Sequence, residues 1–518
     1  MNPLKARQNR SAAGAVLGIA ALFSGCSSQN NGPNEPSPSA VTAGSSSAAG
    51  AAIAQGGQAG TSGGAGATSG ASAVGTSGST AGGSGAGGEP GVAGRGTAGG
   101  GTAGGDTSGG GQGGAAGGSG PGPLGSAACV PGDGRQLHVT PTGSVNGDGA
   151  SFATALDFAT ARARAEPGDT ILLQPGKYSV PYVEGVKNTL VLSQLGTAEK
   201  PLRIIAQGGR AEFDFSFPEQ AWVQDSYGFL VSGSYWSMCR VDVTRAGYQG
   251  VYVTGQHSTF EDCSFHDNRN TGLEINKGGA HTSVINCDAY RNYDPKKLGS
   301  MADGFGPKET QGPGNRFYGC RAWENSDDGF DAYESPETVI IERSFAFRNG
   351  IDVWEYGGFD GNGNGFKLGG NAQQANHRVY QCAAFANRVK GFDQNNNSGG
   401  ITIYNSTAFD NATNFALGGA LNAGQKHDLR NNVSVGAAGS IGSADQQNNS
   451  WTLQLTVTSA DFQDLSVASG SAPRGADGAL PSSEFLRLEP GSALIDAGVD
   501  VGLPYSGAAP DLGAFESP

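Results

Sequence analysis

Short runs of alternating apolar and polar residues, closed by Asn and Gly, recur through the middle of the chain. Six of them align with one another: CSFHDN (263–268), CDAYRN (287–292), CRAWEN (320–325), SFAFRN (344–349), CAAFAN (382–387) and STAFDN (406–411). Their first residues lie 24, 33, 24, 38 and 24 positions apart, so a 24-residue repeat with insertions of 9 and 14 residues explains every step. Strands and turns recurring at this period, without a helical period, predict an all-β solenoid, a right-handed parallel β-helix.

Four of the six repeats begin with Cys, and all six end in Asn. Residues that recur once per coil stack on one another, so these thiols are predicted to be buried in the core; Cys239 begins a weaker earlier copy. The even number of cysteines after Cys26 also fits disulfides, and coils about 4.8 Å apart allow an occasional one. We expect most thiols to be free. The Asn residues are predicted to form a ladder at a turn, where Asn tolerates the left-handed conformation.

A second pattern follows the Asn of each coil: a Gly and then a large apolar residue, which we expect to stack in the core. The pairs are Gly272-Leu273, Gly304-Phe305, Gly329-Phe330, Gly365-Phe366 and Gly391-Phe392. The folded region is expected to begin near residue 135. Residues 151–164 are predicted to form a short helix, and GDTILLQPGKY (168–178) a turn, a strand and a turn.

Residues 1–26 resemble a bacterial lipoprotein signal. Three basic residues precede a run of small and apolar residues that is too short to span a bilayer. The run ends at Cys26, which is predicted to carry the lipid. An ordinary cleaved signal with a chance cysteine is the alternative. Either signal predicts an exported protein, and the lipid would place it at the cell surface or the outer membrane.

Residues 27–128 consist mainly of Gly, Ala, Ser and Thr and have almost no large apolar side chains. Such a segment cannot bury enough surface to offset the entropy of ordering it, so it is predicted to be a disordered tether. Residues 129–518 are then the β-helix domain. The formal net charge of −14 argues against a general role in binding nucleic acid. An acidic protein can still bind an anionic polymer through a local cationic patch or a metal ion.

Counting from each core aromatic residue places charged side chains in register on consecutive coils. Two positions before it stand Asp303, Asp328, Asn364 and Lys390, and one position after it stand Gly306, Asp331, Lys367 and Asp393. Asp303 and Asp328 are therefore predicted to stack, with Asp327 and Asp331 close by. Carboxylates this close repel one another, and a hard cation with oxygen ligands, such as Ca²⁺, would compensate. A solvated acidic ridge or a purely structural calcium site would also explain them.

Lys367, one coil beyond Asp331, suits a base in an elimination reaction. A polyuronate has a carboxylate on C5, and a cation bound to that carboxylate acidifies the C5 proton. A neutral lysine can remove this proton while the C4–O4 bond breaks. A nearby cation and burial would lower the lysine pKa from about 10.4, and Asp331 would raise it. A surface lysine paired with Asp331 is the alternative.

From about residue 262 to 398 the sequence resembles polysaccharide lyase family 9, the pectate lyases with a ten-coil β-helix. The motifs that carry the resemblance are ADGFGPK (302–308), ENSDDGFDAY (324–333), GNGFKLGG (363–370) and KGFDQNNN (390–397). The resemblance implies cleavage of polygalacturonate to 4,5-unsaturated products, with Lys367 as the Brønsted base. It also implies one catalytic Ca²⁺ bound by Asp303, Asp327, Asp328 and Asp331. Phe330 departs from the family, in which many members have Trp at this position.

Further basic residues near the same face are candidates for binding uronate carboxylates: Lys308, Lys390, Arg269 and Arg388. Each could equally be an ordinary surface charge. Polygalacturonases are β-helices that hydrolyse with paired aspartates, but the Gly-His-Gly and Arg-Ile-Lys segments that they carry do not occur in this sequence. A lyase for another polyuronate, such as alginate, remains an alternative. So does a calcium-stabilised adhesin, although an adhesin would not need Lys367. We expect a monomer that acts on pectate and contacts the membrane only through its anchor.

Overall fold

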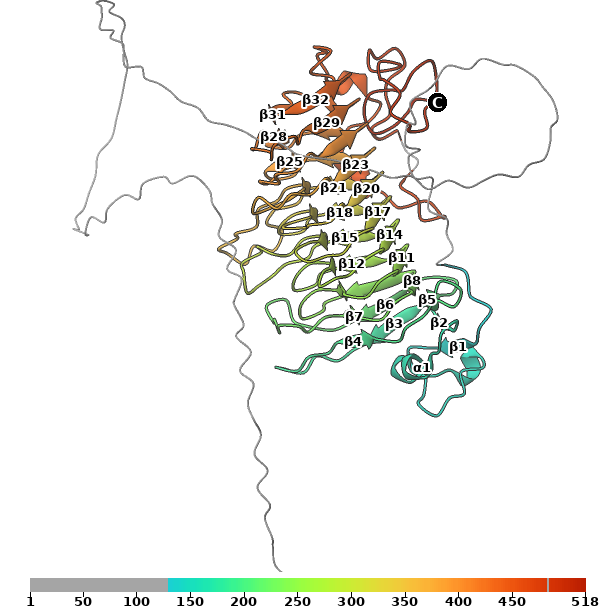
Figure 1. The fold of residues 1–518 in the computed structure, drawn as a ribbon. Helices are drawn as coiled ribbons and strands as arrows, with labels where there is room; N and C mark the ends of the chain where they lie inside the picture. Colours follow the sequence, from blue (N-terminus) through green and yellow to red (C-terminus); the bar gives the residue numbers. More distant parts are fainter. Residues whose placement is uncertain (1–128, 482–483) are drawn as a thin grey trace, which may run out of the picture. The chain divides into compact units, whose positions relative to one another are not determined.

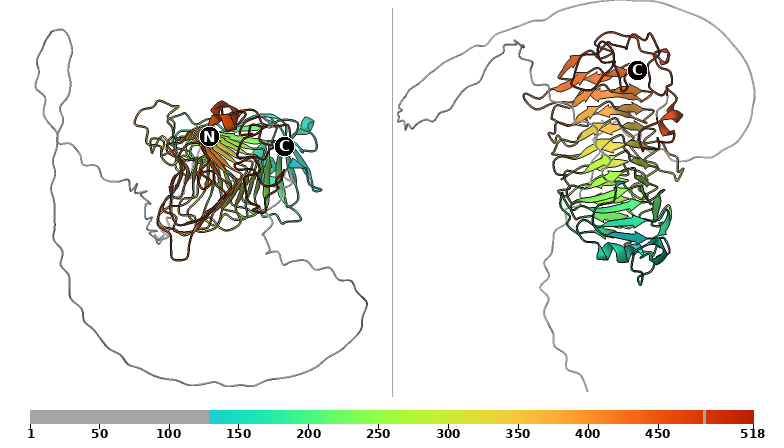
Figure 2. Two further views of the ribbon diagram at one scale, coloured as in Figure 1. Left: turned by 90° about the horizontal axis from the view of Figure 1, so that it is seen from above. Right: turned by 90° about the vertical axis from the view of Figure 1, so that its right-hand side faces the viewer.

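The computed structural model describes residues 129–481 and 484–518, which form a stack of coils (Figure 1). The predicted signal (1–26), its Cys26 and the predicted tether (27–128) lie outside the described residues. Three parallel sheets run the length of the stack, and successive strands of one sheet come from successive coils (Figure 2). The predicted parallel β-helix is confirmed.

The strands of each sheet follow in the order in which they pair. Sheet A consists of β1 (Gln136–Val139), β2 (Thr170–Leu173), β5 (Leu202–Ala206), β8 (Trp236–Cys239), β11 (Thr259–Glu261), β14 (Ser283–Ile285), β17 (Arg316–Tyr318), β20 (Ile340–Glu342), β23 (Arg378–Tyr380), β26 (Thr402–Tyr404), β29 (His427–Arg430) and β32 (Ala444–Gln447). Sheet B consists of β3 (Gly176–Ser179), β6 (Ala211–Asp214), β9 (Val241–Thr244), β12 (Ser264–His266), β15 (Asp288–Tyr290), β18 (Arg321–Trp323), β21 (Phe345–Phe347), β24 (Ala383–Phe385), β27 (Thr407–Phe409) and β30 (Val433–Ser434). Sheet C consists of β4 (Leu190–Leu192), β7 (Phe229–Val231), β10 (Val251–Val253), β13 (Leu273–Ile275), β16 (Phe305–Pro307), β19 (Phe330–Asp331), β22 (Phe366–Lys367), β25 (Lys390–Asp393), β28 (Thr413–Leu417) and β31 (Gly439–Ile441).

The aromatic residues of sheet C stack in the interior, as the Gly–aromatic pattern predicts. Phe305 pairs with Phe330, Phe330 with Phe366, and Phe366 with Phe392. Their ring centroids are 5.1, 4.9 and 5.0 Å apart, and all four side chains are buried. Because side chains alternate between the two faces of a strand, the residue that follows each Phe points outward. This register places the predicted site on the outer face of sheet C.

The predicted Asn ladder is present at the turn between sheets B and C. The side chain of Asn268 donates to Asn292 at 3.0 Å, that of Asn292 to Asn325 at 2.8 Å, and the series continues through Asn349 and Asn387 to Asn411. The expectation that these Asn residues adopt the left-handed conformation is wrong. The positive φ angles, between 51° and 56°, belong to the residue before each Asn: Asp267, Arg291, Glu324, Arg348, Ala386 and Asp410. That backbone turn lets each Asn side chain reach the next coil from inside the turn.

The six cysteines of the described residues divide into two groups. Four are buried free thiols, as predicted: Cys263, Cys287, Cys320 and Cys382. Cys239 does not belong to their row, because β8 pairs it with Glu261, two residues before Cys263. It forms a disulfide with Cys129 instead. The prediction that Cys239 starts an earlier repeat is therefore wrong, and the disulfide ties the start of the described chain to strand β8.

The predicted helix at residues 151–164 is shorter in the structure. A 3₁₀ turn, η2 (Phe152–Thr154), precedes α1 (Phe158–Arg164). The side chain of Asp157 accepts from the Thr160 amide at 2.7 Å and so starts the helix only at Phe158. The ring centroid of Phe158 lies 4.7 Å from that of the interior residue Phe213, so α1 covers the first coils of the core (Figure 1).

The segment after β32 packs on the outside of sheet B. It contains two 3₁₀ turns, η3 (Ser459–Asp461) and η4 (Val467–Ser471). The ring of Phe485 lies 5.7, 5.2 and 6.5 Å from those of Phe345, Phe385 and Phe409. This contact buries the apolar outer face of sheet B in the later coils. In the part of the chain that the structure describes, no helix has the length and apolar character needed to cross a membrane.

Candidate active site and metal centre

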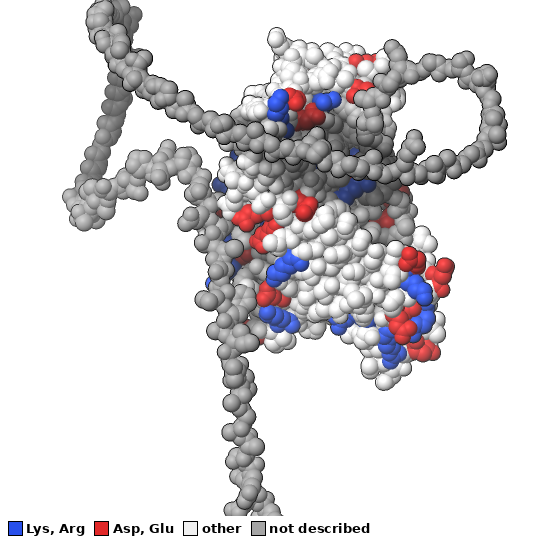
Figure 3. Space-filling view, in the orientation of Figure 1, with Lys and Arg blue, Asp and Glu red and all other residues white. Residues whose placement is uncertain are grey.

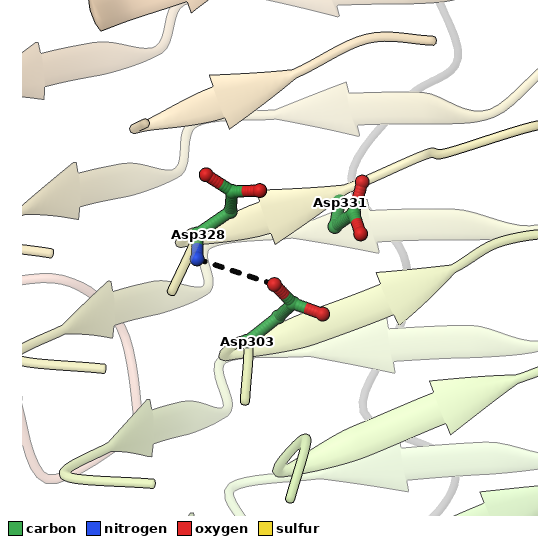
Figure 4. Close-up of side chains that lie close together, drawn as sticks. All are labelled: Asp303, Asp328 and Asp331. Carbon is green, nitrogen blue, oxygen red and sulfur yellow. Dashed lines mark hydrogen bonds between the residues drawn. The ribbon is translucent and has the colours of Figure 1, made fainter. Parts of the chain in front are cut away.

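Three of the four predicted metal ligands come together on the outer side of sheet C. Asp303 and Asp328 stand two residues before the core aromatic residues of β16 and β19, and Asp331 follows Phe330 on β19. One carboxylate oxygen from each lies within 4.8 Å of the others (Figure 4). The Asp328 amide also donates to Asp303 Oδ1 at 3.2 Å. All three residues are almost completely buried.

Asp327, the fourth predicted ligand, lies outside this group of three oxygens. One of its carboxylate oxygens accepts from the Met301 amide at 2.9 Å, and the other accepts from the Asn362 amide at 2.7 Å. Met301 belongs to the loop 293–302 (called the first insert) and Asn362 to the loop 350–363 (called the second insert), the loops that contain most of the added residues of the two longer repeats. Asp327 thus holds both inserts beside the aspartate cluster.

Two lysines neutralise part of the cluster. Lys367 Nζ lies 3.0 Å from Asp328 Oδ2 and 3.5 Å from Asp331 Oδ1. Lys308 Nζ lies 2.6 Å from Asp303 Oδ2 and 3.3 Å from Asp331 Oδ2. Both ammonium groups are largely buried, with side-chain exposures of 13% and 8%. Asp331 therefore sits between the two lysines, and β19 and β22 place it directly beside Lys367 on the next strand.

The charge state follows from burial. Burial raises the pKa of Asp328 to about 7 and those of Asp327 and Asp331 to about 6, while Lys367 opposes this rise in all three. Burial alone would lower the pKa of Lys367, but the surrounding aspartates together hold it well above its ordinary value. The pKa of Lys308 is raised in the same way against the effect of burial, first by Asp303 and Asp331. Without a further cation, both lysines are therefore charged.

The donor set fits a hard divalent cation. All donors of the group are carboxylate oxygens, which suit Ca²⁺. Among the described residues, Asp328 Oδ2 is buried without a hydrogen bond and lies 3.0 Å from Lys367 Nζ. The four aspartates carry a formal charge of −4 and the two lysines +2, so a charge of −2 is left for a cation to balance. An acidic ridge open to solvent would not be buried in this way.

The other predicted substrate-binding residues have different surroundings. Lys390 is about one-third exposed and pairs with Asp393 at 3.0 Å; Asp393 follows Lys367 in the outward row. Arg269 is buried, and its guanidinium donates to the carbonyl oxygens of Phe217, Pro218 and Asp267. These contacts fasten neighbouring turns and take up guanidinium donors of Arg269, which also lines a pocket beside the two inserts. Arg388 similarly donates to the Gly361 carbonyl of the second insert at 2.7 Å.

The sequence analysis assigned no role to two further residues of the site, Thr271 and Asn364. Thr271 Oγ1 donates to Asp303 Oδ2 at 3.1 Å. Asn364 donates to Asp328 Oδ1 through both its amide and its side chain, each at 2.8 Å. Asn364 appeared in the sequence register without a role, and Thr271 occupies the same position relative to Leu273. Extending the count by one coil would therefore have identified Thr271.

Comparison with known proteins shows that the chain is similar to pectate lyases. The family model described as "Pel9A-like, right handed beta helix region" matches residues 137–432. Pectate lyase L of Dickeya dadantii (strain 3937) is 54% identical over 384 residues, covering 74% of this chain and 90% of that protein. Pectate lyase L of Paenibacillus polymyxa (strain SC2) is 34% identical over 390 residues, covering 71% and 84%. The crystal structure of pectate lyase Pel9A superposes with a TM-score of 0.73 at 54% identity, covering 74% of this chain and 96% of that one.

Proposed function

This chain belongs to the family of Pel9A-like right-handed β-helices, and from this premise we propose that it cleaves pectate by calcium-dependent β-elimination with Lys367 as the base. The family membership confirms the resemblance to polysaccharide lyase family 9. The chain is accordingly an enzyme of the pectate lyase type. The calcium requirement, the ligand set and the role of the lysine are the parts that need argument.

The observation that carries the proposal is the pairing of Asp331 with Lys367 on neighbouring strands, beside two further buried carboxylates. Asp303, Asp328 and Asp331 would bind the calcium ion, with Asp327 at the edge of the site. Bound calcium would supply positive charge next to the uronate carboxylate and so acidify the C5 proton. A purely structural calcium site would not need a buried lysine at 3.0 Å from one of the ligands.

The reaction requires Lys367 in its neutral form. Its pKa is raised by Asp328 and Asp331, so balancing the charge of these carboxylates lowers that pKa. Neutral Lys367 then takes the C5 proton, and the C5–H electron pair becomes the C4–C5 double bond. The C4–O4 bond breaks, and the departing oxygen receives a proton from solvent. The charged lysine afterwards loses its proton to solvent, and the cycle can repeat.

The test is ultraviolet absorbance of the new double bond, which is conjugated to the C5 carboxylate. The full chain is mixed with polygalacturonate in calcium or in excess chelator. We expect a rise only with calcium, and Lys367→Ala should reduce the rate by about 100-fold or more. Lys426→Ala is the control, because Lys426 is an exposed lysine that pairs with Asp445 and belongs neither to the cluster nor to the predicted substrate-binding residues. New reducing ends without ultraviolet absorbance would show hydrolysis and refute the proposal.

The place of action follows from the substrate, because pectate is an extracellular polymer. We propose that the chain is exported, acts as a monomer and is held to the membrane by a lipid on Cys26. Labelling of the full chain with a radioactive fatty acid tests the anchor. Label that persists in Cys26→Ser would exclude it.

A further inference from the structure

A pocket of about 240 Å³ lies next to the inserts, apart from the aspartate cluster. Its walls include Arg245 and Arg291 from the turns after β9 and β15, Tyr293 from the first insert, and Trp354 and Tyr356 from the second insert. On the face drawn in Figure 3, acidic and basic side chains lie in small mixed groups separated by uncharged surface. The pocket itself combines arginines with aromatic rings, a composition that suits an anionic sugar.

One side of the pocket is aromatic. The ring centroid of Tyr293 lies 4.9 Å from that of Trp354 and 5.2 Å from that of Tyr356. The Tyr356 hydroxyl donates to Glu219 at 2.6 Å, which fixes the second insert against the turn that contains Glu219. Tyr293 is buried, and Trp354 and Tyr356 are partly exposed. Aromatic rings held in this way offer apolar faces against which the C–H face of a sugar ring packs, with a polar group at the edge.

The other side of the pocket presents the partly exposed guanidinium of Arg291, which forms two ion pairs but no hydrogen bond among the described residues. Arg291 has a side-chain exposure of 41%, and its nearest carboxylates, Asp267 and Glu324, are 3.5 and 3.7 Å away. Within the described residues its guanidinium has no hydrogen bond in the structure, whereas Arg245 donates two to Asp214. Because both ion pairs are longer than a hydrogen bond, the N–H donors of Arg291 can bond the two oxygens of an incoming carboxylate. Three arginines against Glu219 and Asp267 leave the charged lining with a formal charge of +1.

We propose that this pocket binds a uronate residue of the pectate chain, with its carboxylate on Arg291 and its ring against Trp354 and Tyr356. The choice of ligand rests on the proposed function. The pocket is close enough to serve the same polymer, because Arg291 contacts Glu324, which is four residues from Asp328. Four residues of extended chain span at most about 14 Å. An oligomer of several uronates can therefore occupy the cluster and the pocket together.

Asp327 connects the two sites. Its carboxylate accepts amide protons from Met301 and Asn362, one in each insert. The same inserts supply the three aromatic residues of the pocket. The pocket wall is thus anchored at the edge of the catalytic cluster, which fixes the spacing between the two sites.

The experiment measures equilibrium binding of saturated oligogalacturonates to the full chain with Lys367→Ala, so that no cleavage occurs. Calorimetry is done in chelator, which removes any contribution of bound calcium. Arg291→Ala should weaken binding of a long oligomer by about tenfold or more, because a charge-assisted bidentate contact is lost. Trp354→Ala should weaken it as well. The matched control is Arg348→Ala, which stands in the same row of turns and pairs with Glu324 at 3.0 Å but does not line the pocket.

Equal affinities for Arg291→Ala and Arg348→Ala would overturn the pocket proposal. In the cleaving enzyme, Arg291→Ala should raise KM for the polymer and leave kcat unchanged; a fall in kcat alone would also count against it. The two proposals fail separately. Elimination that requires Lys367, together with binding that ignores Arg291, refutes only the pocket, whereas binding that requires Arg291 without elimination refutes only the reaction.

Discussion

Replacing Lys308 tests whether the aspartate cluster depends on an internal cation when calcium is absent. Lys308 Nζ contacts Asp303 at 2.6 Å and Asp331 at 3.3 Å in a buried setting. Lys308→Met keeps much of the side-chain volume and removes the charge. The formal charge of the four aspartates and two lysines then changes from −2 to −3. We expect the metal-free protein to become less stable and its affinity for calcium to rise.

The magnitude follows from the loss of one partner in a buried ion pair. Such a loss typically costs about 3–5 kcal/mol, because the remaining charge stays buried without compensation. Protonation of Asp331, whose pKa is raised to about 6 chiefly by burial, would reduce this cost in acid. The effect should therefore be measured near pH 8, where the carboxylates are ionised. Each tenfold gain in calcium affinity adds about 1.4 kcal/mol to the stabilisation at saturating calcium.

The assay is urea unfolding of the full chain in chelator and in calcium, for the wild type, Lys308→Met and Lys390→Met. Lys308→Met should lower the midpoint in chelator, and calcium should raise its midpoint more than that of the wild type. Lys390→Met should change little in either condition, because Lys390 is about one-third exposed. Equal calcium increments for the wild type and Lys308→Met would refute the argument that Lys308 and calcium balance the same carboxylates.

Two further predictions concern the scaffold. Asn325→Ala removes a buried link that bonds Asn292, Asn349 and the Ala289 carbonyl, and should cost about 3 kcal/mol or more in free energy of unfolding. The control is the exposed Asn146→Ala, which, measured alongside by urea titration, should stay within about 0.5 kcal/mol of wild type. Burial lowers the pKa of His377 to about 4, below the unfolded value of about 6.5, and its Nδ1 accepts from the Val339 amide. Its contribution to stability is therefore complete above pH 6.5 and is lost as the pH falls toward 4, with a slope of about 1.4 kcal/mol per unit. His377→Asn keeps an acceptor and cannot ionise, so unfolding curves between pH 4 and 6.5 should lose that slope; an unchanged slope would contradict the assignment.

The register of the site could be predicted because it depends on the interior of the coil. Phe305, Phe330 and Phe366 are each preceded by Gly, and their stacking fixes which neighbours point outward. That local rule was enough to predict that Asp331 lies beside Lys367, as the pairing of β19 with β22 confirms. Repetition makes such inference strong, because every coil must satisfy the same packing and the same ladder.

Features that occur in one coil only could not be predicted from the repeat. Asp327 turns toward Met301 and Asn362 because the inserts present two free amides there, and insert conformations follow no repeat. Cys239 resembles a repeat position in sequence, yet pairing places it opposite Glu261, and its disulfide partner is 110 residues away. The sequence does not show that Arg269 has hydrogen-bond partners, whereas in the fold its guanidinium donates to three carbonyl oxygens.

The breaks in the period nevertheless point to function. A solenoid gains stability from identical coils, so residues that lengthen a coil must be retained for another reason. The two inserts flank a single coil, the one that contributes Asp328 and Asp331, and they supply Tyr293, Trp354 and Tyr356 to one pocket. Both are also fastened by Asp327, which stands next to Asp328 in the sequence. The positions at which the 24-residue spacing fails therefore coincide with the pocket that we propose binds pectate, and the effect of Arg291→Ala on binding tests this proposal.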